Sequence, residues 1–581
     1  MSSIEAITYW GPSHYSKRPC VAFTFEERTT DAERHLIERC QSAQNYLTAN
    51  LSYRKASEKI ETLKDAFTFI AHASLFILNY VRGDLSEHGY IEATEKPTVY
   101  IEFHSPKLTV KALEIVLSLG LLEKSKHETT LGNFWDECQR IHPDFQAHTL
   151  ITAAKKRGLY YTSVGGGVWL YGSGELSRAF FETSPVEDME QEFQADKLSG
   201  KMLFEKLNIP TADYEIAENY DEVIAAAQRI GFPCAIKPIA SGSGKGVTAN
   251  IQSIEEVSFA FSEASKHLRK SKKIIIERFI DGRDYRLLVV NGRYVGCASS
   301  SAPSIIGDGT STVGELIAEK NRKRSRNLYA SGYLRPINID ASVIETLTVQ
   351  KLDLDSILPA EKQVTLRRNT NLGGGGSTEI FDNVHPTVVN YAEKIARSSG
   401  LYSVGVDYIS KSIEVPPEIS NGKFTELNRT PGVPLFIAAG YDINQLGDTF
   451  LGPSINNIPI NLYILRPSNM QKFFDSYSGK DALFLPNILV RKGKVIQAKK
   501  AHFSQLLIKT LADRSLTALD IIGSDEFMKK NGFPTEHLSK IVIENLCMSN
   551  FVKKTIDKLE SDPDVFVETQ EKILQLSNTV K

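Results

Sequence analysis

Two groups of residues in this 581-residue sequence have the types and spacing that phosphate chemistry requires. The first group lies in PCAIKPIASGSGKGV, which runs from Pro233 to Val247. In this segment Lys237 ends an apolar run, and three glycines follow it, namely Gly242, Gly244 and Gly246. A strand that ends at the lysine would hold its ammonium group at a fixed point, while the glycines would let backbone N–H groups close over an anion. By itself, the segment fits a surface hairpin with a solvated lysine equally well.

The same segment contains parts of two other ATP-binding motifs but completes neither of them. A P-loop has the pattern GxxxxGK[ST]. When Gly244 and Lys245 are aligned with its GK pair, Ile239 stands where the first glycine belongs. Gly246 then stands where the magnesium-binding hydroxyl belongs. A protein kinase has its glycine-rich loop before the lysine strand and HRD and DFG segments after it, whereas here the glycines follow the lysine and neither segment occurs.

The second group consists of oxygen-bearing side chains farther along the chain. VGVDYIS predicts a strand that carries Asp407, and GKFTELN predicts another strand with Glu426 and Asn428. Residues two apart on a strand project from the same face, so Glu426 and Asn428 would lie together. Asp407 on a neighbouring strand would complete a cluster suited to Mg²⁺, which prefers carboxylate, phosphate and water oxygens. Each residue alone is typical of a solvated strand, but the set behind a lysine and a glycine loop indicates a nucleotide site.

The sequence around these groups supplies strands and helices that would position them. Between residues 160 and 280, strand and helix patterns alternate. DEVIAAAQRI has helical periodicity and stops at Gly231, and KIIIERFI has the composition of a buried strand. In DYRLLVVNGRYVGCAS, the pair Asn291-Gly292 predicts the type I′ turn of a β-hairpin. These elements indicate a mixed α/β architecture.

The composition is that of a globular protein without a strong charge bias. Lysine and arginine total 68 and aspartate and glutamate total 70, for a formal net charge of −2. This balance gives no support to a nucleic-acid or membrane partner. The longest apolar stretch, Phe69–Val81, is too short for a membrane span and predicts a core helix. The six cysteines form no CxxC pair and the first residues show no secretory signal, so we expect a cytoplasmic protein with reduced thiols.

With both groups in view, the chain resembles the ATP-grasp ligases and, among them, the cyanophycin synthetase family. The resemblance covers residues 5 to 450 and rests on several motifs in the family's order. In the nucleotide-binding part they are QADKLSGKMLFEKLNIPTADY, IKPIASGSGKGV and IIIERFIDGRDYRLLVVNGRYVG. Later motifs are SAPSIIGDGTSTVGELI, LRRNTNL and VHP, and the earlier ones are YWGPSHYSKRPCVAF and GGGVWLYGSGE.

The resemblance implies an α/β (α+β) protein with an ATP-grasp fold. We expect an N-terminal α/β domain over residues 1–160 and an ATP-grasp domain over residues 161–452, with a lid around residues 240–330. Residues 453–581 would form a small C-terminal α/β domain, as a reduced Mur-ligase remnant, a scaffold or a dimer contact. We therefore expect a homo-oligomer.

The resemblance also implies which residues bind ATP. Lys197 and Lys237 would neutralise the α- and β-phosphate oxygens. The loop of Gly242, Ser243, Gly244 and Gly246 would form a lid that keeps water from the γ-phosphate. The adenine edge would meet Glu277 and the backbone of Phe279 and Ile280, and the ribose hydroxyls would meet Asp284.

The implied reaction is the attack of a substrate carboxylate on the γ-phosphate, which gives an acyl phosphate and ADP, followed by displacement of the phosphate by an amine. Such a reaction needs positioning and charge neutralisation rather than a protein nucleophile. Asp407, Glu426 and Asn428 would hold one or two Mg²⁺ ions, with Mn²⁺ as an alternative. Arg286 and Arg367 would steady the transferring phosphoryl group, with a surface ion pair as the alternative for each. Asn371 would contact the substrate.

Three departures from the family limit what the resemblance implies about substrates. The family's GTNGKT P-loop of the Mur-ligase half is replaced by NNIPINLYILRPSNMQKFF, so we expect no Mur-type activity and a single ATP site. This points to the short form of the family, which lacks a working Mur half. NLGGGGS replaces NLSTGG at residues 371–377, and TPGVPLF replaces APGFRMH at residues 430–436.

Three functions remain open from the sequence. The first is a ligase that polymerises β-aspartyl-arginine dipeptides onto a polymer end, as the short form of the family implies. The second is a one-step ligase that joins two small amino-acid metabolites, which the altered NLGGGGS and TPGVPLF segments favour. The third is a nucleotide-binding scaffold without turnover, against which the intact set of lysines and metal ligands argues.

Overall fold

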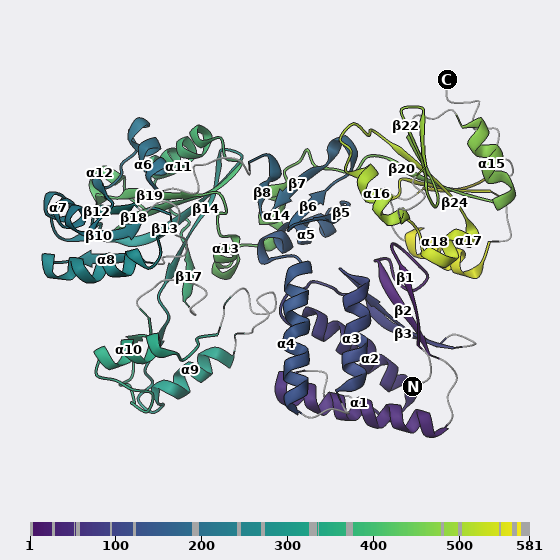
Figure 1. The fold of residues 1–581 in the computed structure, drawn as a ribbon, viewed down its shortest axis with the longest axis horizontal. Helices are drawn as coiled ribbons and strands as arrows, with labels where there is room; N and C mark the ends of the chain where they lie inside the picture. The colour runs from purple at the N-terminus through teal and green to yellow at the C-terminus, as the bar shows by residue number, and fades with distance from the viewer. Residues whose placement is uncertain are drawn as a thin grey trace. The chain divides into compact units, whose positions relative to one another are not determined.

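The computed structural model divides into two compact units, each formed by more than one stretch of the chain (Figure 1). The first unit comprises Met1–Asp144, Ala154–Ala179 and Leu451–Lys581, and the second comprises Phe145–Ala153 and Phe180–Phe450. The residues that the structure describes are 4–25, 30–51, 53, 59–92, 96–119, 124–188, 197–240, 246–268, 273–322, 324, 334, 336–367, 376–477, 481–497, 502–544, 548–560 and 566–570. Among the helices within these ranges, none has the length and apolar character needed to cross a membrane.

The N-terminal part of the first unit is an antiparallel sheet with helices packed against it. The sheet has the order β1-β2-β4-β3, with β1 at Ile4–Tyr9, β2 at Cys20–Phe25, β3 at His88–Glu92 and β4 at Pro97–Glu102. The helices are α1 (Thr30–Leu51), α2 (Leu63–Asn79), α3 (Pro106–Ser118) and α4 (Lys124–Ile141). Helix α2 contains the apolar stretch that begins at Phe69 and is deeply buried, which confirms the predicted core helix. Thr62 caps it, because its side chain accepts a hydrogen bond from the N–H of Asp65 and the Asp65 carboxylate accepts one from the N–H of Thr62.

The C-terminal part of the first unit is built on a seven-stranded sheet of order β23-β22-β21-β24-β20-β25-β26. The strands are β20 (Ile460–Leu465), β21 (Asp481–Phe484), β22 (Ile488–Arg491), β23 (Lys494–Gln497), β24 (Leu519–Ser524), β25 (Lys540–Glu544) and β26 (Phe566–Gln570). The helices are α15 (Pro467–Ser476), α16 (Phe503–Leu511), α17 (Asp525–Asn531) and α18 (Asn550–Glu560). The strands from β21 to β26 in this order pair in parallel. The segments INLYIL and LDIIGS thus form neighbouring strands in one sheet.

The two parts of the first unit share one apolar core. Tyr9, Cys20 and Ala22 from β1 and β2 belong to the same buried cluster as Ile460, Leu462 and other residues of the C-terminal sheet. Hydrogen bonds reinforce this packing, since the N–H of Trp10 donates to the carbonyl of Asn531 and Lys558 donates to the carbonyl of Tyr15. The hairpin of β5 (Tyr161–Gly165) and β6 (Val168–Tyr171) belongs to this unit as well. Helix α5 (Phe145–Lys156) precedes the hairpin and is followed by Gly158, whose φ is 64°.

The second unit contains two antiparallel sheets that carry the predicted site residues. The first has the order β11-β10-β12-β9, with β9 at Tyr214–Ala217, β10 at Cys234–Pro238, β11 at Thr248–Ile251 and β12 at Ile274–Arg278. Helices α7 (Tyr220–Ile230) and α8 (Val257–Ser265) share its apolar core. Helix α7 begins at the side-chain cap of Asn219 and ends at Gly231, whose φ of 80° favours glycine. Helix α6 (Lys197–Lys206) packs instead on the second sheet.

The second sheet of this unit has the order β17-β14-β13-β18-β19. Its strands are β13 (Arg283–Val290), β14 (Arg293–Ser301), β17 (Ser377–Ile380), β18 (Ser403–Ser410) and β19 (Lys423–Asn428). The helices that follow or accompany them are α11 (Pro386–Ser399), α12 (Pro417–Ser420), α13 (Val433–Ala439) and α14 (Ile443–Leu451). Asn291 and Gly292 join β13 to β14 with φ values of 49° and 70°, which confirms the predicted two-residue turn. Strands β7 (Arg178–Phe181) and β8 (Ser184–Pro185) pair where the chain enters this unit.

A smaller lobe lies between β14 and β17 in the sequence and has its own apolar core. It contains β15 (Ser304–Ile306) paired with β16 (Gln363–Thr365), and helices α9 (Val313–Arg322) and α10 (Ala341–Val349). Ile305, Val313 and Leu347 are among the residues that fill its core. The lobe therefore does not depend on the main sheets for its own packing.

Candidate active site

Lys237 on β10 forms an ion pair with Glu277 on the adjacent strand β12. Its Nζ lies 2.8 Å from Glu277 Oε2. A second lysine, Lys201 on α6, places its Nζ 3.2 Å from the other carboxylate oxygen of Glu277. All three side chains are sequestered, with exposed fractions of 13% for Lys237, 4% for Glu277 and 0% for Lys201. One carboxylate is therefore shared between two ammonium groups.

The charges in this trio shift one another's pKa values. Burial alone would raise the pKa of Glu277, but attraction to Lys237 and Lys201 outweighs it and leaves that pKa below its ordinary value. Burial would lower the pKa of Lys237, yet Glu277 holds it above the ordinary value. For Lys201 burial prevails over the attraction of Glu277 and lowers the pKa to about 8. The glutamate is thus held ionised by two positive neighbours.

The three predicted metal ligands come together on the second sheet. Asp407 on β18 lies directly opposite Glu426 on β19. Asn428 projects from the same face as Glu426 and donates from Nδ2 to Asp407 Oδ2 at 3.1 Å. Lys197 approaches the cluster from the start of α6, with its Nζ 3.6 Å from Glu426 Oε1. The N–H of Lys197 also donates to the carbonyl of Ile239, which ties the start of α6 to the end of β10.

Arg286 closes this cluster from the third strand. It lies directly opposite Asp407 in the pairing of β13 with β18. Its Nε contacts Asp407 Oδ1, its Nη2 lies 3.2 Å from Oδ2, and its Nη1 donates to the carbonyl of Pro431 at 3.1 Å. Gly405 provides the space for this arrangement, because a Cβ atom there would lie 2.8 Å from Arg286 Cδ. The fork-to-fork contact fixes the orientation of the Asp407 carboxylate.

The electrostatics of this cluster favour a bound cation. Loss of solvation raises the pKa of Asp407 to about 6; Arg286 opposes this rise, while Glu426 and Asp284 add to it. Three carboxylates are therefore close enough to repel one another, and a divalent cation would relieve that repulsion. Among the described residues, no group of three or more His, Cys, Asp or Glu side chains is placed to hold a metal, so the Asn428 amide would supply the third donor beside Asp407 and Glu426. The carboxylate and amide oxygens of this set are of the kind that Mg²⁺ accepts.

The remaining predicted residues fall into four groups. Phe279 and Ile280 follow β12 directly, and the N–H of Phe279 already donates to the carbonyl of Pro233 at 3.0 Å. Gly246 has a φ of 71°, a conformation that favours glycine. Arg367 lies in the small lobe, where its Nη2 donates to Asp340 Oδ2 at 2.7 Å and to the carbonyl of Asn338. The predicted residues that lie outside the described part of the chain are Gly242, Ser243, Gly244 and Asn371.

Lys201 is a site residue that the sequence interpretation missed. It follows Lys197 by four positions, so the two lysines lie on one face of α6. The sequence did contain a signal for this residue, because Lys201 occupies a helix position where the periodicity predicts a buried apolar side chain. The partners of Glu277 were also unforeseen, because the sequence predicted an adenine contact for this side chain rather than a double ion pair.

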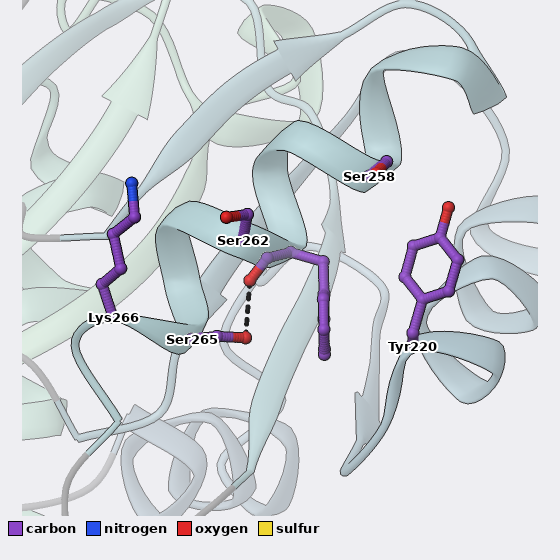
Figure 2. Close-up of a pocket in the computed structure, with 6 residues that line it drawn as sticks. Tyr220, Ser258, Ser262, Ser265 and Lys266 are labelled. Carbon is purple, nitrogen blue, oxygen red and sulfur yellow. Dashed lines mark hydrogen bonds between the residues drawn. The ribbon is translucent and has the colours of Figure 1, made fainter.

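A surface hollow lies elsewhere in the second unit (Figure 2). Figure 2 shows Tyr220 of α7 across from α8, which carries Ser258, Ser262 and Ser265, with Lys266 just beyond the end of that helix. None of the residues that line this hollow belongs to the predicted site. The predicted site residues lie instead on the two sheets of this unit.

Comparison with known proteins bears directly on these two sheets. The family model of the ATP-grasp domain matches residues 202–292, a segment that contains Lys237, Glu277, Asp284 and Arg286. The chain carries an ATP-grasp domain. This match confirms the predicted α/β class and the predicted ATP-grasp fold.

Several curated proteins are similar to the chain, in agreement with the resemblance expected from the motifs. The chain is 33% identical over 249 residues to the cyanophycin synthetase of Synechocystis sp., which covers 42% of this chain and 28% of that protein. It is 29% identical over 252 residues to a glutathione biosynthesis bifunctional protein of Streptococcus mutans, covering 41% of this chain and 32% of that one. A solved bifunctional glutathione synthetase from Pasteurella multocida has a TM-score of 0.43 at 20% identity, over 60% of this chain and 50% of that one. The chain thus spans about a third of the length of the curated relatives.

Proposed function

We propose that this protein is an ATP-dependent carboxylate–amine ligase that forms amide bonds through an acyl phosphate and releases ADP. The observation that carries the proposal is the approach of Lys237 to the metal-ligand cluster. The two sheets meet at the start of α6, where Lys197 Nζ lies 3.6 Å from Glu426 Oε1 and the N–H of Lys197 donates to the carbonyl of Ile239, two residues after Lys237. Burial lowers the pKa of Lys237, whereas the charges of Glu277, Glu426 and Asp284 raise it, in agreement with this approach. A phosphate chain between them would meet an ammonium group on one side and a cation on the other.

Each residue has a task in this reaction. Lys197 and Lys237 neutralise phosphate oxygens, and Asp284 meets the ribose. Asp407, Glu426 and Asn428 hold Mg²⁺, which when bound neutralises the charge on the phosphates. Arg286 keeps the Asp407 carboxylate in place.

The reaction then proceeds by two displacements. A substrate carboxylate oxygen attacks the γ-phosphorus as its bond to the β-phosphate oxygen breaks and ADP leaves. The amine nitrogen next attacks the acyl carbon, phosphate leaves with the bonding electrons, and the amine proton passes to solvent or phosphate. The ATP-grasp domain supplies positioning and charge rather than a nucleophile.

For the substrates, we propose β-aspartyl-arginine-type dipeptides that are joined into a cyanophycin-like polymer. Similarity to cyanophycin synthetases and the N-terminal motif YWGPSHYSKRPCVAF support this choice. In this view residues 1–160 hold the growing chain, residues 161–452 carry out the ligation, and residues 453–581 support the N-terminal domain.

A second candidate is a one-step ligase that joins two small amino-acid metabolites. The segments NLGGGGS and TPGVPLF differ from the family pattern next to the expected substrate site, and one relative is a glutathione biosynthesis protein. Under this candidate the same phosphate and metal residues act, but the product is released after one condensation.

Incubation with Mg-ATP and β-aspartyl-arginine, followed by mass spectrometry, separates the two candidates. A ladder of products that differ by one dipeptide supports the polymerase, whereas a single condensation product supports the one-step ligase. The same assay is run with a panel of amino acids and dipeptides as carboxylate and amine substrates. If no pair releases ADP above background, the protein is a nucleotide-binding scaffold and both ligase candidates fail.

A further inference from the structure

We propose that Lys201 is a positioning residue that leaves Lys237 with a net positive charge for the nucleotide phosphates. This inference rests on the proposed function, because it assigns a role to a residue behind the same phosphate site. It concerns a side chain that no ligand touches, since Lys201 is completely buried.

The charge balance of the trio carries the inference. If Lys237 and Glu277 were paired alone, they would form a neutral pair, and a neutral pair attracts an anion weakly. Lys201 Nζ lies 3.2 Å from Glu277 Oε1, while Lys237 Nζ lies 2.8 Å from Glu277 Oε2. The three side chains together carry one net positive charge. Because Lys201 has no exposed surface, the exposed member of the trio through which this charge can act is Lys237.

The cost of burying a lysine indicates that the charge itself is needed at this position. An apolar side chain of similar length would fill the same space beneath Tyr214, whose ring centre lies 5.6 Å from Lys201 Nζ. Transfer of an ammonium group from water to the protein interior is strongly unfavourable unless its partners compensate. Here the partners are a carboxylate and a hydroxyl, so packing alone does not account for lysine.

Lys201 also connects the two sheets that form the site. Its Nζ donates to Thr211 Oγ1 at 3.1 Å, and Thr211 in turn donates to the carbonyl of Phe424 at 2.9 Å. Phe424 lies on β19, two residues before Glu426. The chain of contacts therefore runs from Lys237 through Glu277 and Lys201 to the strand of the metal ligands, and it fixes the lysine relative to that strand.

The test compares the binding of ATP and adenosine to the full-length protein, both measured by calorimetry. In K201M we expect ATP affinity to fall by about tenfold or more, because a unit charge near the phosphates is lost. We expect adenosine affinity to stay unchanged, because adenosine has no phosphate. K206M is the matched control, since it makes the same replacement on the exposed side of the same helix, and it should bind both ligands as the wild type does.

A double variant separates charge from packing. In K201M/E277Q the trio again carries one net positive charge, so we expect ATP affinity to recover toward the wild-type value. A purely structural role predicts instead that the double variant binds ATP no better than K201M. That result would overturn the inference, and so would a loss in K201M that is equal for ATP and adenosine.

The wild-type protein provides a measurement that does not depend on the folding of a variant. The charged and titratable groups that face Lys201 are Glu277 and Lys237 on the first sheet, Glu205 on its own helix and Tyr214 on β9. Lys201 loses its proton near pH 8, before Lys237 does. ATP affinity should therefore fall above about pH 8 while adenosine affinity stays constant, and an ATP affinity that is flat to pH 10 would contradict the inference. A wild-type protein that binds no ATP at any pH would instead refute the proposed function.

Discussion

At the scale of single residues, two carboxylates of the site are each contacted by two other side chains. Glu277 lies between Lys201 and Lys237, and Asp407 receives contacts from Arg286 and Asn428. Each anion is held by two partners, so the removal of one partner leaves a poorly compensated charge rather than a simple gap. Substitutions at these positions therefore act on charge and orientation first.

Lys237→Ala should reduce ADP release by about a hundredfold or more, because it removes a charge that we propose neutralises the phosphate oxygens of ATP. The measurement is the steady-state rate with Mg-ATP and the substrates identified by mass spectrometry. Lys206→Ala on the exposed face of α6 is the control and should retain the wild-type rate. If Lys237→Ala retains that rate as well, the nucleotide does not lie at this lysine.

The buried Lys201 should give the protein a specific dependence of stability on pH. Its pKa is about 8 in the folded state and 10.5 in the ordinary, unfolded state. Between these values the unfolded chain binds more protons than the folded one, so the free energy of unfolding rises with pH. The wild type should gain about 3 kcal/mol relative to K201M from pH 7 to pH 11, since each pKa unit corresponds to about 1.4 kcal/mol. Urea unfolding of both proteins at several pH values measures this, and a constant difference would contradict it.

Gly405 allows a third test at this scale. In Gly405→Ala the new Cβ would lie 2.8 Å from Arg286 Cδ and 2.9 Å from Pro431 Cα, so we expect Arg286 to be displaced from Asp407. The kcat should fall by about tenfold or more, because the Asp407 carboxylate, which we propose holds Mg²⁺, loses its orientation. Gly132→Ala is the matched control, because a Cβ at Gly132 on α4 meets no atom within 4 Å. It should leave kcat unchanged; equal kcat values for both variants would show that the arginine has no role.

At the scale of elements, local patterns could be predicted but strand neighbours could not. The turn at Asn291-Gly292 and the end of α7 at Gly231 follow from glycine conformations that are visible in the sequence. By contrast, β13 pairs with β18, which lies more than a hundred residues later, and this register is what places Arg286 opposite Asp407. Such a pairing depends on side-chain packing across the whole sheet rather than on the segment itself. The burial of Lys201 has the same origin, since it depends on what packs against α6.

The cap of α2 offers a prediction about an element far from the chemistry. Thr62→Ala should lower the free energy of unfolding by about 1 kcal/mol, because the N–H of Asp65 loses its acceptor. Thr62→Ser keeps the hydroxyl and should retain most of the stability. Thermal melts of the two variants and the wild type measure the difference. Equal melting temperatures for the alanine and serine variants would mean that the hydroxyl contributes nothing.

At the scale of the whole molecule, the first unit is assembled from both halves of the chain. The outer face of β1 and β2 packs into the core of the C-terminal sheet, and Arg18 forms an ion pair with Glu536 at 2.5 Å. From the sequence we expected separate domains over residues 1–160 and 453–581, because a local pattern reveals an apolar face but not the residues that cover it. In the structure that face is covered by residues from the other end of the chain.

Removal of residues 453–581 should therefore damage the N-terminal part rather than leave it intact. Tyr9, Cys20 and Ala22 would lose the packing that now buries them. We expect the truncated protein to be cleaved rapidly by protease within residues 1–144, while residues 180–450, which form most of the second unit, resist cleavage. Mass spectrometry of the fragments reads this out. Equal resistance of both regions would show that the N-terminal part folds alone.

The shared core also sets the order in which the protein can mature on the ribosome. The apolar face of β1 and β2 is synthesised first, but its partner strands begin at Ile460. At about 5–20 residues per second, that face waits for tens of seconds before it can be covered. During this interval the nascent chain exposes an apolar surface, while residues 180–450, which form most of the second unit, have time to fold. A chaperone that covers this face during synthesis should therefore raise the yield of folded protein.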